Sequence, residues 1–409
     1  MKILILLSHP YQYRQFEKSI NHDKHDVSYV GTKKNIQTIP AHLKCFKFEI
    51  KAPLDTFEET KNVIGQKAHF DRIISLWERG LLDAAKLRKH WSVPGSTTEE
   101  ILKVRHKVIM KTLVKNAGIE APKFISVKDF FENKTASKTE KMWKGKTVLK
   151  PFLEWASAGI KIFDSFESAV NFLSENKKDY IASFEMEEFI DADICHLDGL
   201  VVDGKIVLHA SGKYLTSNFD FAKGKVSLSV QIDPEKKLFG WAQKVVSAVG
   251  IKNGAIHLEF FQTPRGPVFL EIANRCGGGA FVNELELKTN VYLPAAETAV
   301  YIGDFSLYDW KKHYNENDFV YGSFNFPAHH LPKGYAKIIN ADFIKNHPNL
   351  VQLQFIKPNR KLYSEVTYQP GIVPITGTIK GKDEQSVTKM LYEIVDKVKV
   401  ESVPKPILR

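Results

Sequence analysis

Short runs of apolar residues alternate with helical patterns over the first part of the chain. Residues 2–7, 26–30 and 72–76 are such runs, and each predicts a buried strand. The spacing of leucine and alanine over residues 81–90 predicts a helix. Strands that alternate with helices are typical of a parallel sheet covered by helices. We therefore expect residues 1–95 to form an N-terminal parallel α/β domain.

The next part of the chain begins with a helix signal and continues with strands. Ser96 and Thr97 both have a glutamate three residues later, as in a capping box, so we expect one long helix to begin near Ser96 and to end at Gly118. The apolar pattern beyond it predicts three strands and then a helix, at residues 123–127, 147–152, 159–163 and 166–176.

Two β-hairpins and a β-rich tail are predicted in the second half of the chain. A strand at 180–190 leads into a hairpin whose Asp203-Gly204 turn is a strong signal for a tight connection. A helix at 238–249 separates it from a second hairpin at 255–275. The tail ends in a helix with one apolar face, which we interpret as core packing, formed by Val387, Met390, Leu391, Ile394 and Val398.

The second hairpin places two acidic residues opposite each other. A three-residue turn, Pro264-Arg265-Gly266, is expected at its tip, and Glu259 and Glu271 each lie six residues from Arg265. The two carboxylates then share one face of the hairpin with Cβ atoms about 5 Å apart. Like charges at that separation repel, and the surrounding residues are too apolar for an ordinary surface element. Such a pair requires a shared proton or a cation.

A cation is compatible with these two oxygen ligands. Mg²⁺ and Mn²⁺ prefer carboxylate oxygens, and Mg²⁺ commonly binds one or two carboxylates together with substrate phosphates. Arg275 lies four residues beyond Glu271 and shares its face if the strand continues, where it would neutralise developing negative charge. The alternative interpretation is a pair of exposed acids with Arg275 as their salt-bridge partner. Spacing alone does not decide between them.

Other charged residues stand out from their surroundings. Lys150 lies inside an apolar strand, so its ammonium group has to meet an anion or reach water. The loop after it contains small residues, Ser157 among them, whose amides could approach phosphates, although an ordinary turn is the alternative. Glu78 ends a predicted strand, at the edge where ligands bind in parallel sheets. Lys107, taken alone, is typical of a helix surface.

Composition and charge narrow the class of protein. The chain has 409 residues, of which 43% are hydrophobic and 26% charged, as in a soluble globular protein. Its longest early apolar run is far shorter than the about 20 residues of a membrane span, and no export signal is visible, so we expect a cytoplasmic protein that binds no membrane. The three cysteines have no metal-type spacing and are expected to be free. The net charge is +11, and the basic runs are short and interleaved with acids. This pattern favours an ordinary solvated surface as the explanation of the charge. Attraction of an anionic ligand is the second explanation, and binding of nucleic acid is the least favoured.

Four motifs, in their order along the chain, resemble those of the ATP-grasp superfamily. They are a leading helix, a strand with a nucleotide-binding lysine, a segment that lines the nucleoside, and a metal-binding hairpin. In this sequence they correspond to residues 105–111, 148–151, 187–193 and 257–278. Within the superfamily the chain is most similar to the L-amino-acid ligases, which join two unprotected amino acids into a dipeptide. The resemblance implies an ATP-grasp domain over 96–305, with a lid subdomain at about 120–190, and a C-terminal α+β subdomain over 306–409.

The resemblance also implies a role for each motif residue. Lys107, Lys150 and Ser157 would contact the phosphates of ATP. The nucleoside would be bound by Glu187, Glu188, Phe189, Ile190 and Asp193. Glu259 and Glu271 would hold Mg²⁺, or Mn²⁺ in its place. Arg275 would be the catalytic residue, and the substrate contacts would be Glu78, Arg275, Gly277 and Gly278. Ala273 departs from the asparagine common in the family, and Asn274 is expected to face away from the acid pair.

The implied activity is that of an ATP-dependent carboxylate–amine ligase. One amino-acid carboxylate would be activated as an acyl phosphate, and the amine of a second amino acid would displace phosphate to form a dipeptide. No protein nucleophile is required, and the partners would be small molecules, with a homodimer left open. The alternatives are a ligase for another acid and amine, and a nucleotide-binding module without turnover. A carboxylase is disfavoured because the chain has no biotin-carrier segment.

Overall fold

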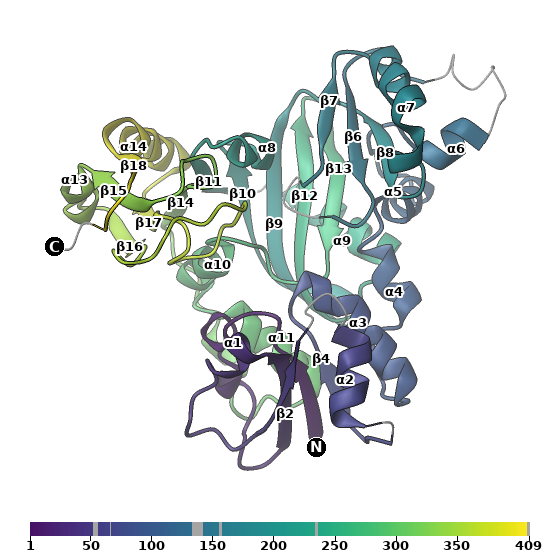
Figure 1. Ribbon diagram of the computed structural model, residues 1–409, viewed down its shortest axis with the longest axis vertical. Helices are drawn as coiled ribbons and strands as arrows, with labels where there is room; N and C mark the ends of the chain where they lie inside the picture. Colours follow the sequence, from purple (N-terminus) through teal and green to yellow (C-terminus); the bar gives the residue numbers. More distant parts are fainter. Residues whose placement is uncertain (52–55, 66, 133–141, 155–157, 234–235, 407–409) are drawn as a thin grey trace.

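The computed structural model describes residues 1–409 except 52–55, 66, 133–141, 155–157, 234–235 and 407–409. Its N-terminal part, purple in Figure 1, is a parallel sheet with the strand order β3-β2-β1-β4, which confirms the prediction of a parallel α/β fold. The elements here are β1 (Lys2–Leu6), η1 (Tyr11–Tyr13), η2 (Phe16–Lys18), β2 (Asp26–Thr32), α1 (Lys33–Ile36), β3 (Phe46–Ile50), α2 (Thr56–Ile64), β4 (Arg72–Ile74) and α3 (Glu78–His90).

Both faces of this parallel sheet are covered, as its continuous apolar strands require. Leu4 and Leu6 of β1 pack on the side of α3, in a cluster with Leu87. Ile3 and Ile5 face the other way and share a cluster with Ile302 from α11 (Leu293–Ile302). A helix from far along the chain therefore closes the N-terminal sheet.

A second, antiparallel sheet with the order β5-β8-β6-β7 forms in the part of the chain that was predicted to be a lid subdomain, and it is called the lid sheet, or the lid, below. Trp143, Leu149 and Met186 lie in its buried core, against the helices at the upper right of Figure 1. Its elements are β5 (Phe124–Ser126), α6 (Val127–Glu132), β6 (Thr147–Pro151), β7 (Lys161–Phe163), α7 (Phe166–Tyr180) and β8 (Phe184–Glu188). Each strand and helix predicted in this part of the chain is present, with bounds that differ by a few residues.

A large antiparallel sheet connects the middle of the chain to the tail. Its order is β13-β12-β9-β10-β11-β14-β17-β16, so the strands of the tail continue the same sheet through the β11–β14 pair. The remaining elements are β9 (Asp193–Val202), β10 (Lys205–Tyr214), α8 (Asn218–Ala222), β11 (Ser227–Ile232), α9 (Lys236–Val249), β12 (Gly254–Thr263), β13 (Gly266–Ala273), α10 (Phe281–Thr289), α12 (Trp310–His313), β14 (Val320–Phe326), β15 (Tyr335–Ile339), α13 (Ala341–Lys345), β16 (Leu350–Phe355), β17 (Ile375–Gly381), α14 (Glu384–Lys397) and β18 (Lys399–Val403).

The apolar face of the last helix, α14, packs as predicted. Val387, Leu391 and Ile394 are completely buried against the strands of the tail. None of the helices in the described parts of the chain is long and apolar enough to cross a membrane. The three cysteines are free, as predicted.

The prediction of one long helix after Ser96 is wrong. The capping box of Thr97 and Glu100 is present, but α4 (Thr98–Lys103) ends before α5 (Lys107–Asn116) begins. Between them, Arg105 turns toward Glu78 and also donates to the Leu153 carbonyl at 2.8 Å. These contacts, together with the apolar packing of Val104, favour a break over a straight helix. The helical pattern alone contained no sign of them.

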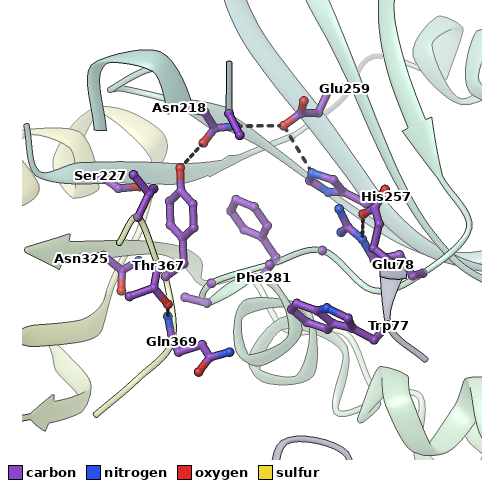
Figure 2. A pocket seen from close by; sticks show the side chains of 18 of the residues that line it. Trp77, Glu78, Asn218, Ser227, His257, Glu259, Phe281, Asn325, Thr367 and Gln369 are labelled. Atoms are coloured by element: carbon purple, nitrogen blue, oxygen red, sulfur yellow. Dashed lines mark hydrogen bonds and ion pairs between the residues drawn. The ribbon is translucent and has the colours of Figure 1, made fainter. Parts of the chain in front are cut away.

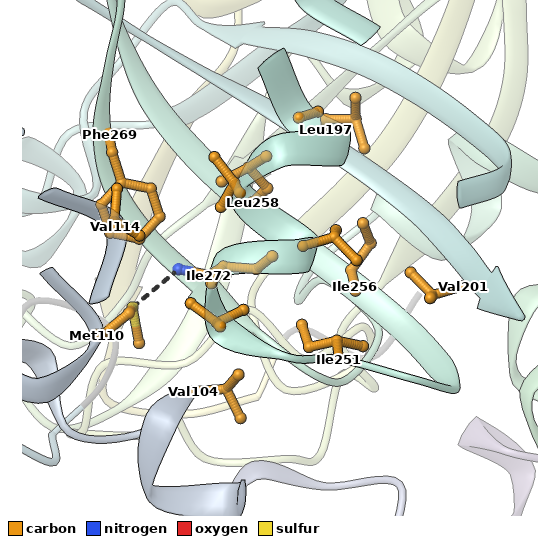
Figure 3. Packing of buried hydrophobic residues seen from close by; sticks show 14 of the residues in the cluster. Val104, Met110, Val114, Leu197, Val201, Ile251, Ile256, Leu258, Phe269 and Ile272 are labelled. Carbon is orange, nitrogen blue, oxygen red and sulfur yellow. Dashed lines mark hydrogen bonds between the residues drawn. The ribbon is translucent and has the colours of Figure 1, made fainter. Parts of the chain in front are cut away.

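The second hairpin has the predicted pairing of acids but not the predicted turn. Thr263 pairs with Gly266, so the turn has two residues, and Gly266 takes a φ of +118°. A β-bulge at Leu270 then shifts the register by one residue and brings Glu259 opposite Glu271. Behind the acids, the other face of the hairpin packs on α5, and the amide of Ile272 contacts the Met110 sulfur at 3.3 Å (Figure 3).

Candidate active site

The N-terminal sheet, the lid, the large sheet and the tail all contribute to one cleft. Its volume is about 1060 Å³. Ser157 lies outside the described residues. All the other predicted site residues line this cleft: Glu78, Lys107, Lys150, Glu187, Glu188, Phe189, Ile190, Asp193, Glu259, Glu271, Arg275, Gly277 and Gly278.

Glu259 is buried and held in place by three hydrogen bonds. Its Oε1 accepts from the Tyr214 hydroxyl at 2.6 Å. The same oxygen accepts from Asn218 Nδ2 at 3.3 Å and from His257 Nε2 at 3.3 Å (Figure 2). Burial raises the pKa of Glu259, but the contacts with His257 and Tyr214 outweigh it and lower the pKa from 4.5 to about 2. The side chain is therefore a carboxylate at neutral pH.

Glu271 is the more open member of the acid pair. Its side chain is 30% exposed, and its Oε2 lies 3.3 Å from the ammonium group of Lys107. The hydrogen bonds to Glu259 recorded among the described residues all end on Oε1, which leaves Oε2 available on the same face as Glu271. Two carboxylates with free oxygens facing a cleft fit a hard divalent cation such as Mg²⁺. Asn274 faces away, as predicted, and donates to the Ala255 carbonyl at 2.9 Å.

Behind Glu259 lies a buried network of histidine and aspartate that sequence reasoning missed. His257 Nδ1 lies 2.9 Å from Asp198 Oδ1, and His196 Nδ1 lies 2.7 Å from Asp198 Oδ2. These three side chains could together hold a metal ion, but in this structure each bonds to another member of the network. The sequence did contain a signal for this network, because residues two apart on a strand lie on the same face. His196 and Asp198 are two apart on β9, and they pair with Glu259 and His257 of β12.

Gly277 follows the hairpin at a point where the loop approaches this network. A Cβ atom there would lie 2.2 Å from Asp198 Oδ1 and 3.0 Å from His257 Nδ1. Only glycine allows the backbone to pass so close. The Gly277-Gly278 segment thereby reaches the cleft and lines it.

Lys150 belongs to a buried ion-pair cluster under the lid. Its Nζ lies 2.8 Å from Glu187 Oε2, and Lys111 Nζ contacts both Glu187 and, at 2.7 Å, Glu185. Burial raises the pKa of Glu187, but Lys111 and Lys150 outweigh it and lower the pKa from 4.5 to about 2. Glu187 thus reaches the cleft with its carboxylate engaged by two ammonium groups. Lys111 was missed because nothing in its local pattern distinguishes a buried lysine from an exposed one.

Lys107 at the start of α5 and the segment that leads from β8 into β9 both line the cleft near Lys150. Lys107, the first residue of α5, donates from Nζ to the Glu154 carbonyl at 2.7 Å. The segment from Glu188 to Asp193 crosses from the lid to the large sheet, and the Phe189 amide is fixed by the Lys146 carbonyl at 3.0 Å. The lysines and this crossing segment therefore face one cavity, beside the acid pair.

Glu78 lies at the carboxyl edge of the parallel sheet, but it is not the end of a strand as predicted. The strand β4 ends at Ile74, and Glu78 is the first residue of α3. Arg105 and Arg275 both form ion pairs with its carboxylate. Burial raises the pKa of Glu78, but Arg275 and then Arg105 outweigh it and lower the pKa from 4.5 to about 2. Glu78 therefore holds Arg275 in place beside the Gly277 loop.

The chain is similar to known proteins both in sequence and in structure. No protein-family model matches the chain. The L-arginine-specific L-amino acid ligase of Bacillus subtilis is 30% identical over 239 residues, which are 55% of this chain and 56% of that protein, so the match spans little more than half of this curated relative. The L-amino acid ligase of Bacillus licheniformis superposes with a TM-score of 0.72 at 15% identity and covers 98% of both chains. A carboxyaminoimidazole ribonucleotide synthase from Aspergillus clavatus, complexed with ATP, superposes with a TM-score of 0.68 at 14% identity, over 97% of this chain and 99% of that one.

The chain has the ATP-grasp fold. This confirms the fold that the four motifs implied, since the superposition extends over nearly the whole chain. In the ATP-grasp fold of this chain, the cleft lies where the lid sheet faces the acid-bearing hairpin, and it continues toward the N-terminal sheet and the tail.

The far end of the ATP-grasp cleft is lined by residues without a motif. Phe281 projects into it, with Trp77 on one side and Thr367 and Gln369 of the tail on the other (Figure 2). The Tyr368 hydroxyl donates to Asn218 Oδ1 at 3.0 Å and so connects the tail to the residues that hold Glu259. Sequence reasoning missed these residues because only the fold brings the tail to the cleft.

Proposed function

We propose that this protein is an ATP-dependent carboxylate–amine ligase that joins two amino acids into a dipeptide and releases ADP and phosphate. The observation that carries the proposal is the convergence of Lys107, Lys150, the Glu259–Glu271 pair and Arg275 on one cleft. Two relatives named as L-amino acid ligases, one by sequence and one by fold, support amino acids as the substrates.

In the proposed reaction the chain positions reactants and balances charge. A carboxylate oxygen of the first amino acid attacks the γ-phosphorus of ATP, and ADP leaves with the electrons of the broken bond. The amine of the second amino acid then attacks the acyl carbon, the phosphate leaves, and the ammonium proton passes to solvent. A divalent cation on Glu259 and Glu271 would neutralise charge on the phosphates while it is bound. Lys107 and Lys150 would contact the phosphate oxygens, and Arg275 the charge that develops at the acyl carbon.

Arg275 suits this role because its position is fixed before a substrate binds. Its guanidinium is held by Glu78 on one side and by the Cys276 carbonyl, at 2.7 Å, on the other. A preorganised cation requires little reorganisation during the reaction, which is the main source of electrostatic catalysis. The absence of a protein nucleophile from this scheme agrees with catalysis by positioning.

A second candidate is a ligase for another acid and amine. It is favoured by one observation, that a carboxyaminoimidazole ribonucleotide synthase has the same fold. The cytoplasmic location and a homodimer stay predictions.

The proposal is tested with pairs of amino acids, ATP and Mg²⁺, measuring phosphate release and product mass. A dipeptide ligase releases phosphate only when amino acids are present, in equal amounts with a product of dipeptide mass. A nucleotide-binding module would bind ATP and release no phosphate with any pair. Phosphate release without a condensed product would contradict the proposal, and Glu271→Gln is the matched inactive control.

A further inference from the structure

The end of the cleft between the N-terminal sheet and the tail is rich in positive charge. Its cationic lining residues come from four separate segments: Arg14, Lys18, Lys34, Arg79 and Arg360. Among the acids that line this end, Glu78 is already neutralised by Arg275 and Arg105. Glu286 is half-buried, and burial raises its pKa, while Glu365 accepts a hydrogen bond from Tyr363 at 2.7 Å. The positive charge at this end therefore exceeds the negative charge.

Arg14 is the half-buried member of this group, and it lies beside Trp77. Its Cζ is 5.6 Å from the ring centroid of Trp77, and its Nη2 donates to the Leu76 carbonyl at 3.5 Å. Trp77 directly precedes Glu78 in the chain. Within the described residues the direct contacts of Arg14 are with backbone carbonyls and this ring, and it forms no ion pair within 4 Å. At longer range it opposes the rise in the pKa of the buried Glu297.

The pKa of His9 is affected by the same positive charges. Its ring lies 3.7 Å from that of Trp77, between centroids. Burial lowers the pKa of His9, and Arg14 and Arg79 lower it further, to about 3. His9 is thus neutral at physiological pH and does not change the positive charge at this end of the cleft.

The tail closes this end of the cleft next to Arg14. The Tyr13 hydroxyl donates to the Pro370 carbonyl at 3.1 Å, and Arg360 Nη1 donates to the adjacent Gly371 carbonyl at 3.2 Å. On the opposite side, Lys18 Nζ lies 4.3 Å from the ring centroid of Tyr292. Lys18 and Arg360 are both exposed and line the same cleft. Neither forms an ion pair with a carboxylate within 4 Å among the described residues, although Lys18 is near enough to Glu286 to oppose the rise in its pKa.

We propose that Arg14, with Lys18 and Arg360 around it, forms a subsite that binds a substrate carboxylate which takes no part in bond formation. The nature of the ligand as an amino acid rests on the proposed function, whereas the anion site itself rests on the charges described above. An arginine without a carboxylate partner gains charge-assisted, bidentate hydrogen bonds from such a group. Two sources offer it: the α-carboxylate of the amine-donating amino acid, and the side chain of an acidic amino acid.

Equilibrium binding to the full-length protein tests the subsite and separates the two sources. Calorimetry with Mg²⁺ and ADP present compares glycine with glycinamide and L-glutamate with L-glutamine. We expect the wild type to bind the acid of at least one pair about tenfold more tightly than its amide, as the loss of a charged hydrogen bond implies. A preference for glycine identifies the α-carboxylate, and a preference for glutamate alone identifies the side chain.

Arg14→Ala should abolish that preference, and Arg14→Lys should retain part of it. Unchanged ADP affinity in both variants shows that they are folded. The matched control is Arg265→Ala, which removes one positive charge from the exposed tip of the hairpin and should keep the full preference. The subsite is refuted if the wild type binds amides as well as acids, binds none of the four ligands, or if Arg14→Ala keeps the preference. Because no turnover is measured, a failure of the ligase assay leaves this result standing on its own.

Discussion

The two ends of the cleft differ in whether their charged side chains form ion pairs with each other. At the end under the lid, charges are buried and matched: Glu187 is engaged by Lys111 and Lys150, and Glu259 by His257. At the end toward the tail, Arg14 and Arg360 donate hydrogen bonds to backbone carbonyls and form no direct ion pair among the residues described. Buried matched charges fix a geometry that does not depend on the ligand, whereas unmatched cations remain available to one. The first arrangement suits an invariant cosubstrate, and the second suits the recognition of a particular substrate.

The largest expected effect comes from removing the open member of the acid pair. Glu271→Ala leaves one carboxylate for a divalent cation and frees Lys107 from its ion pair. We expect a loss of phosphate release of roughly a thousandfold, comparable to the removal of other groups that stabilise transition-state charge. The measurement is the initial rate at saturating ATP and Mg²⁺. Glu401→Ala, which removes an exposed carboxylate of β18, is the control and should act like the wild type.

Wild-type turnover in Glu271→Ala would overturn the metal assignment. It would also weaken the comparison of the two ends of the cleft, because Glu271 would then be only the partner of Lys107 in a structural ion pair.

A smaller effect is expected from acid, at the junction of the two ends. The pKa of Glu78 is lowered from 4.5 to about 2 in the folded protein, so its ion pairs add to the free energy of unfolding above about pH 4.5. That contribution, of about 3 kcal/mol, is lost as the pH falls from about 4.5 toward 2. Urea unfolding across this pH range measures it.

The matched variant for this prediction is Glu78→Gln. It should be less stable than the wild type at pH 7 and should lose less stability in acid, since the titrating group is gone. Parallel pH profiles of the two proteins would show that Glu78 is not held ionised by Arg105 and Arg275.

The smallest effect concerns the network behind Glu259. His257→Asn keeps a polar group but removes the Nε2 contact that orients Glu259 Oε1. Loss of a residue that orients a metal ligand typically costs 10- to 100-fold in metal affinity, and we expect about a tenfold rise in the Mg²⁺ concentration for half-maximal rate. The maximal rate at saturating Mg²⁺ should change little. A Mg²⁺ titration identical to that of the wild type would show that the network has a structural role only and does not orient Glu259 for metal binding.

The sequence was informative where strand alternation and chain order determine position. The parallel N-terminal sheet and the Asp203-Gly204 turn, with φ values of 49° and 77°, followed from local rules. The opposite placement of Glu259 and Glu271 was predicted from a three-residue turn, but in the structure a two-residue turn and the bulge at Leu270 produce it together. The break before Lys107 did not follow from local rules, because it depends on contacts of Arg105 with residues distant in the chain.

The substrate end was the least predictable part of the molecule. Arg14, Thr367 and Tyr368 belong to loops at opposite ends of the chain, and no periodicity relates them to each other. They meet because β14 pairs with β11, which brings the tail to the central sheet. Similarly, Lys111 is buried although the helical pattern gives no reason to distinguish it from its exposed neighbours. Long-range pairing, not local propensity, decides both.

Because of the bulge at Leu270, the spacing of the two carboxylates in the acid-bearing hairpin does not depend on the turn at its tip. The extra residue lies within β13, between the tip and Glu271, so the spacing of the two carboxylates is set by the strands and not by the connection that joins them. The side chain of the connecting residue Arg265 is 82% exposed, and its guanidinium lies 3.6 Å from the exposed carboxylate of Glu120. The loop can therefore accept an insertion, such as a short epitope, without a change in the distance between the carboxylates, and it is the natural place to attach a label for following the reaction.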